Sequence, residues 1–142
     1  MKQFIVTAAV LPLLIAFLVA FGEIQEQNVI IAAIDDTVYA AKELARQEGC
    51  FSEKVQDYLR SQLCKRIKGL KENDVIIGSK TDTVPVFRAG LGGSNGLIRY
   101  QVSVAVPAGR SGKLIGVRQR ENKPYYVIDS FTVSEYVPAA GY

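Results

Sequence analysis

The sequence predicts an α+β protein in which a long N-terminal helix, membrane-like in its first half, packs against a small antiparallel β-sheet head. The prediction comes from an uncharged apolar run at the start, an amphipathic pattern that continues it, and alternating apolar residues later in the chain. These features divide the 142 residues into an apolar half-helix (1–22), an amphipathic half-helix (23–49) and a globular head (50–142).

The apolar run extends from Phe4 to Phe21, and Thr7 is its one polar residue. As a helix it would be about 27 Å long, close to the ~30 Å hydrocarbon core of a bilayer. Lys2 precedes the run and Glu23 follows it. By the positive-inside rule, the N-terminus then lies in the cytoplasm, the run spans the cytoplasmic membrane, and the rest of the chain lies outside the cell.

Such a run has three interpretations: a signal peptide, a plain anchor, or the stem of an assembling subunit. Ala20-Phe21-Gly22 is a weak small-x-small cleavage site, but the run exceeds the about 7 to 15 apolar residues of a typical signal, so we expect it to be retained. Pro12 removes one helical hydrogen bond, which a plain anchor also tolerates. The residues that follow the run are therefore needed to distinguish these three interpretations.

The segment from Glu23 to Glu48 continues the helix with an amphipathic pattern. It contains no helix breaker before Gly49, a natural C-terminal cap. Apolar residues recur in it every seven positions, at Ile24, Ile31, Val38 and Ala45. We expect one nearly continuous helix from about Gln3 to Glu48, on the order of 70 Å long.

The stretch FIVTAAVLPLLIAFLVAFGE resembles the hydrophobic N-terminus of type IV pilin-like proteins, in particular the TadE-like pseudopilins of tight-adherence pilus systems. The shared features are the Val-Leu-Pro-Leu-Leu core at 10–14 and the Gly-Glu pair at 22–23, and the likeness covers roughly residues 4 to 49. The resemblance implies a pilin-like fold and a structural subunit of a helical filament of identical chains, with the membrane and a pilus assembly machinery as further partners. The residues it assigns to packing in the filament core are Phe4, Ile5, Leu11, Pro12, Leu13, Leu14, Phe17, Leu18, Phe21 and Gly22.

The chain departs from the family at Val6, where the family pattern has a glutamate about six residues before the proline. That glutamate is usually linked to processing and to the register of a new subunit on its neighbour. Two interpretations stay open: either Met1 is a mature terminus made from a longer precursor, or the protein is inserted into the membrane without such processing.

The head begins with a second helical pattern and continues with strands. Ser52 is a predicted N-cap, Gly69 ends the helix, and one helix face carries Val55, Leu59, Leu63 and Ile67. Strand patterns follow at 75–78, 84–88, 97–106, 113–118 and 125–136, with Pro85 indicating an edge or bulge. In IRYQVSVAV the apolar residues alternate, which predicts a sheet with one buried face against the long helix.

Cys50 and Cys64 would lie outside the cell, where disulfides persist. A bond between them would close a ~15-residue loop and contribute about 3 kcal/mol of stability in the chain-entropy model. A straight helix between them would hold them about 20 Å apart, too far for bridged Cα atoms. An intrachain bond, buried thiols and an intersubunit bond stay open.

The composition argues against an enzyme. The chain has no histidine and no tryptophan, which removes Ser-His-Asp catalysis, histidine-containing zinc sites and covalent haem attachment. Asp35 and Asp36 form its one adjacent acid pair and lie on a helix without a partner base. We therefore expect no catalytic residue, no cofactor and no metal site.

The charge distribution and the glycine-rich loop point to contacts rather than to nucleic acid. Residues 23–48 carry six acids against two bases, a net of −4, and residues 49–142 carry fourteen bases against eight acids, a net of +6. An acidic stem and a basic head would help like subunits meet, although both faces can also be merely solvated. The bases are scattered, so no specific nucleic acid is predicted. RAGLGGSNGLIRY lacks phosphate-loop spacing and predicts a hairpin loop, with residues 90–96 as a contact surface.

The leading hypothesis is therefore a structural subunit of an extracellular pilus-like filament, held in the membrane until assembly. One alternative is a membrane-anchored minor pseudopilin or accessory protein of a secretion or conjugation apparatus. The other is an anchored extracellular binding module that recognises a ligand through its sheet edge or its glycine-rich loop. In a filament the surface from Phe4 to Phe21 contacts protein, whereas in both alternatives it contacts lipid.

Overall fold

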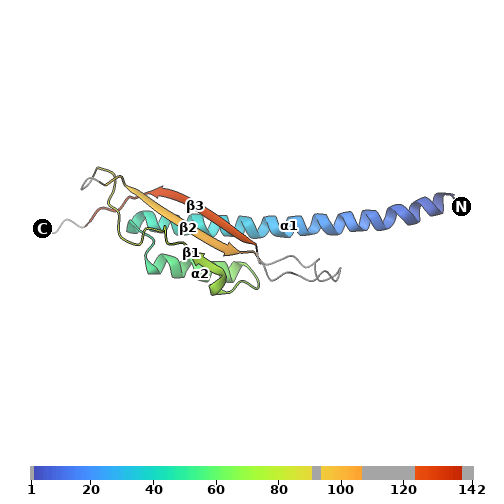
Figure 1. Ribbon diagram of the computed structural model, residues 1–142, viewed down its shortest axis with the longest axis horizontal. Coiled ribbons are helices and arrows are strands. Elements are labelled where there is room, and N and C mark those ends of the chain that lie inside the picture. Colours follow the sequence, from blue (N-terminus) through green and yellow to red (C-terminus); the bar gives the residue numbers. More distant parts are fainter. Residues whose placement is uncertain (1, 91–93, 107–123, 139–142) are drawn as a thin grey trace.

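The computed structural model describes residues 2–90, 94–106 and 124–138. It has the expected α+β arrangement, with a long N-terminal helix and a three-stranded antiparallel sheet. Helix α1 (Lys2–Glu48) forms a rod whose first half projects well beyond the head, and its second half lies along the sheet (Figure 1).

Helix α1 runs without interruption through Pro12 and Gly22. Pro12 has no N–H, so the carbonyl of Ala8 lacks its usual helical donor, yet the helical conformation continues on both sides. The helix ends where expected, because Gly49 takes the left-handed conformation (φ +79°) that glycine adopts most easily. One continuous helix is thus confirmed.

Helix α2 (Glu53–Arg66) starts as the sequence predicts and packs its apolar face inward. The Ser52 hydroxyl accepts a hydrogen bond from the Val55 amide at 3.4 Å, which caps the helix. The buried face comprises Val55, Leu59 and Leu63, and Ile67 follows it in an extended conformation. The helix therefore ends before Ile67 rather than at Gly69, and a short 3-10 turn, η1 (Glu72–Asp74), leads into the sheet.

The sheet has the order β1-β2-β3 and is antiparallel throughout. Its strands are β1 (Val75–Ile77), β2 (Leu97–Ala105) and β3 (Tyr125–Val133). Val104 pairs with Val75 on one side, and Val102 pairs with Ile128 on the other. The alternation in β2 is confirmed, since its inward side chains Ile98, Tyr100, Val102 and Val104 are buried. They meet α1 and α2 in one core.

Three predicted strands need separate comment. The prediction for 84–88 is wrong. Pro85 has no amide hydrogen, the Val86 amide donates to Gly49 (2.9 Å), and that of Arg88 donates to Tyr136 (3.0 Å), so no sheet partner is used. The predicted strand at 113–118 lies outside the described residues. Strand β3 ends at Val133 rather than at residue 136.

The heptad stripe of α1 is buried only where the head covers it. Ile34, Val38, Ala41 and Ala45 are buried in the core, whereas Ile24 is 56% exposed and Ile31 is half-buried. The stripe was predicted along the whole amphipathic half. The reason for the difference is that the end of the sheet reaches the helix near Gln27 and Ile31, so Ile24 lies beyond it.

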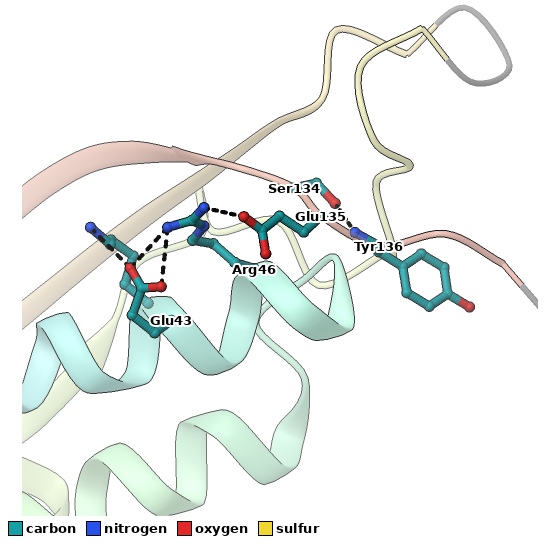
Figure 2. A network of polar contacts seen from close by, with 6 residues as sticks. Glu43, Arg46, Ser134, Glu135 and Tyr136 are labelled. Carbon is teal, nitrogen blue, oxygen red and sulfur yellow. Dashed lines mark hydrogen bonds and ion pairs between the residues drawn. The ribbon is translucent and has the colours of Figure 1, made fainter.

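The C-terminal segment 134–136 ties the sheet to the end of α1 (Figure 2). The Glu135 amide donates to the Arg46 carbonyl at 2.9 Å, and the Arg46 guanidinium pairs with the carboxylates of Glu43 and Glu135. Ser134 is fully buried, and its hydroxyl donates to the Val86 carbonyl at 2.6 Å. We call this set of contacts the α1 joint.

Gly49 is the tightest point of the α1 joint. A Cβ at this position would lie 2.8 Å from the Tyr136 Cβ and 2.9 Å from the Val86 carbonyl oxygen, closer than real contacts allow. Gly69 has a similar conformation (φ +87°), but nothing lies within 4 Å of its Cβ position. Comparing substitutions at the two glycines therefore distinguishes the cost of backbone strain, which both share, from the cost of steric overlap, which arises only at Gly49.

We expect Gly49→Ala to destabilise the head more than Gly69→Ala. Both changes cost about 1–2 kcal/mol of left-handed strain, and overlap at position 49 adds about 1–3 kcal/mol. The measurement is urea unfolding of the full chain in detergent, followed by tyrosine fluorescence, because every tyrosine lies beyond the apolar run. Equal losses for the two variants would contradict the tight packing of the α1 joint.

Candidate functional site: the bare apolar half of α1

Every side chain of α1 from Gln3 to Gly22 is exposed. Exposure reaches 80% for Phe4, 73% for Leu13 and 68% for Phe17. By length and composition, α1 is long and apolar enough to cross a membrane, with a mean hydropathy of 2.8 in its most apolar window, and the described residues bury none of that window. This segment, residues 3–22, is hereafter the bare stem.

The bare stem is apolar on all sides rather than along one stripe. Neighbouring positions such as Leu13, Leu14 and Ile15 are all more than half exposed, and successive side chains on a helix point about 100° apart. Its internal polar side chain, Thr7, donates its hydroxyl to the Gln3 carbonyl at 2.9 Å and so needs no outside partner. A helix apolar all round requires an apolar environment all round.

The free-energy cost of leaving these apolar side chains in water excludes water as the resting environment of the bare stem. Leaving one large apolar side chain in water instead of burying it costs about 1.5–3 kcal/mol. Summed over the nine Phe, Leu and Ile side chains of the run, that cost is roughly 14–27 kcal/mol, as large as or larger than the about 5–15 kcal/mol that typically stabilises a whole domain. Lipid or other proteins must therefore cover the bare stem.

The structure brings all ten sequence-predicted stem residues onto this one segment. Pro12 and Gly22 lie inside the helix, and nothing lies within 4 Å of the Cβ position of Gly22. What the ten residues contact in an assembly stays a prediction. Exposure on every side is the property that they share.

The amphipathic half of α1 uses much of its acidic charge within the chain. Asp35 accepts a hydrogen bond from the Tyr126 hydroxyl at 3.2 Å, and Asp36 lies 3.9 Å from the Arg66 guanidinium. Burial, followed by the nearby Asp35 charge and this hydrogen bond, raises the pKa of Tyr126. The adjacent acid pair thus has partners in its own head, which the sequence did not indicate. Exposed pairs of this kind contribute little to the free energy of folding, so the same charges can also interact with a neighbouring molecule.

The two cysteines are free thiols, one before α2 and the other within it. Cys50 is buried just before the helix, and Cys64 is partly exposed near its end. From Glu53 to Cys64 the helix rises about 17 Å, so the uninterrupted helix disfavours an intrachain bond. Burial raises the pKa of both thiols, helped by Glu48 at Cys50 and by Glu72 and Asp74 at Cys64.

The sequence analysis missed two features around the bare stem. One is the α1 joint. The polar side chains of the Ser-Glu-Tyr run at 134–136 were the only hint of it in the sequence. The other is a shallow depression where the sheet end meets α1, lined by Gln27, Ile31, Val106, Pro124, Tyr125 and Tyr126. Residues far apart in the chain form both features.

No family model, curated protein or solved structure matches the chain in comparisons with each. Within residues 2–90, 94–106 and 124–138, no group of His, Cys, Asp and Glu side chains could hold a metal ion. The functional argument therefore rests on the exposure of the bare stem and on the way the head is attached to it.

The thiols provide a test of this arrangement. We expect a maleimide to label Cys64 in the folded full chain, and Cys50 only after unfolding, because Cys50 is 4% exposed. Labelling of Cys64 should be slow at pH 7 and accelerate as the pH rises, since its raised pKa lowers the thiolate fraction. Mass spectrometry of the labelled peptides measures both, and Cys64→Ser isolates Cys50. A protein that takes up label only after reduction would contain the disulfide instead.

Proposed function

We propose that this protein is a structural subunit of an extracellular pilus-like filament, assembled by packing of the bare stem. The observation that carries the proposal is the two-part nature of α1. Its first half is apolar on all sides and bare, and its second half forms the core of the head. One uninterrupted helix joins the two halves.

The proposed mechanism is an exchange of environments. The bare stem first lies in the cytoplasmic membrane and then leaves it to pack against the stems of identical subunits. Lipid chains are about as apolar as leucine, so the transfer carries no large hydrophobic penalty, and side-chain packing decides the outcome. Pro12 and Gly22 would permit local unwinding where neighbouring stems require it.

The attachment of the head supports a filament over a plain anchor. An anchor requires only a span, and a flexible linker between span and head serves it well. Here α1 passes from Gly22 to the core residue Ile34 without a break, and the α1 joint fixes the far end of the helix. A rigid connection is useful where the orientation of each head must follow the packing of its stem. The likeness of residues 4–49 to pilin-like proteins agrees with this reading.

A second candidate is a membrane-anchored minor pseudopilin or accessory protein, and Val6 favours it. The family uses a glutamate at that position to register a new subunit, whereas Val6 is an exposed apolar side chain. If the bare stem contacts lipid alone, the head would then act as a monomer on the membrane surface. An anchored binding module would leave the bare stem in the same environment.

Electron microscopy of material sheared from cells that make the protein tests the proposal. We expect uniform filaments composed of this chain, with mass spectrometry giving the N-terminal residue of the filament subunit. A protein that stays in the membrane fraction and behaves as a monomer in detergent would support the accessory role instead.

Leu14→Arg is the substitution that we expect to abolish filaments. A charge at the centre of a span costs about 2.5–3.5 kcal/mol on insertion scales, which the remaining apolar residues offset, so membrane insertion should survive. An unpaired charge among packed stems has no such relief. Leu14→Ile and Val84→Arg are the controls, the first apolar and the second at a 72% exposed position of the head. Normal filaments from Leu14→Arg, counted by electron microscopy, would refute the stem model.

A further inference from the structure

The end of the sheet nearest the bare stem forms a distinct surface. There β2 and β3 pair Ala105 with Tyr125, and the Val106 amide donates to the Pro124 carbonyl at 2.9 Å. This end of both strands points toward the N-terminal half of α1 (Figure 1). It meets the helix at Gln27 and Ile31, which line the depression described above.

The height of this surface along α1 is set by the helix rise. Gln27 lies about 7–8 Å beyond Gly22 along the axis, and Ile31 about 13–14 Å beyond it. A bilayer adds about 5–7 Å of headgroup region on each side of its hydrocarbon core. When the bare stem spans the core, the sheet end is therefore at the outer edge of the headgroup layer and just above it.

The side chains at this height suit a headgroup layer. Tyr125 is 52% exposed and combines an apolar ring with a polar tip, a side chain that is enriched at membrane–water interfaces. Below it on α1, Ile24 is 56% exposed, beyond the part of the head that the structure describes. Tyr126 is half-buried and directs its hydroxyl to Asp35, so it holds the β3 end against α1.

We propose that this surface, the interfacial seat (Ile24, Gln27, Ile31, Tyr125 and Tyr126), rests on the phospholipid headgroups of the outer leaflet while the subunit is in the membrane. The inference rests on the membrane-resident stage of the proposed function and adds a second contact with the lipid. The helix gives continuity, because α1 runs from residue 22 through Ile24 to Gln27 and Ile31 without an intervening linker. The seat fixes the depth of the head and must leave the lipid when a subunit is extracted.

Single-tryptophan reporters can test the seat, because the chain has no tryptophan of its own. Phe17→Trp, Tyr125→Trp and Phe131→Trp are each reconstituted as full chains in phosphatidylcholine vesicles. The quenchers are bromines placed deep on the acyl chains or a nitroxide attached to the choline headgroup. Phe131 is the matched control, since it is 64% exposed on the same outward face of β3 but about 20 Å further from the seat.

We expect the acyl bromines to quench Phe17→Trp and the headgroup nitroxide to quench Tyr125→Trp, with Phe131→Trp unaffected by either. Gln27→Trp is a second reporter on α1, which guards against misfolding of the Tyr125 variant and should respond as Tyr125→Trp does. If both seat reporters are as insensitive as Phe131→Trp while Phe17→Trp is quenched, the seat is refuted and the membrane stage stands. If Phe17→Trp also escapes quenching, the membrane stage of the proposed function fails, and the seat fails with it.

Discussion

The packing of the second half of α1 against α2 and the sheet, in one shared core, is the contact on which the rest of the structure depends. Ala41 and Ala45 are fully buried, and their small side chains let the neighbouring elements of the head approach the helix closely. Ile34 and Val38 belong to the same buried cluster as the inward residues of β2. Without this contact the three short strands would lack a partner layer, and the bare stem would have no fixed relation to the head.

One helix thus solves two different burial problems. Along residues 34–45 it presents a stripe to its own head, in which polar positions such as Asp35 and Asp36 alternate with the buried ones and find partners on the surface. Along residues 3–22 it has no polar side of any extent, and no described residue of the head covers it. The change from stripe to all-round apolar surface marks the boundary between the part of α1 that the head buries and the part that the described residues of the head leave exposed.

Local patterns made the elements of this fold predictable. The absence of helix breakers between Glu23 and Glu48 predicted α1, the N-cap residue Ser52 predicted the start of α2, and the alternation of apolar residues predicted β2. The strand predicted around Pro85 was wrong because β propensity says nothing about which backbone partners are available, and these were taken by Gly49 and Tyr136. The α1 joint and the interfacial seat each combine segments separated by many residues, so no local pattern could indicate them. The bare stem was predictable, since hydrophobicity over its length is a local property.

The continuity of α1 has a mechanical consequence. A tensile load that pulls the head along the helix axis passes through the α1 joint into a series of axial hydrogen bonds, and a chain of bonds in series yields at its weakest member. Pro12 removes one such bond, that of the Ala8 carbonyl, in the middle of the bare stem. The helix therefore stretches first near residues 8–12, far from the head. The compact β-sheet is spared deformation, and the extension is confined to the segment that projects beyond the head.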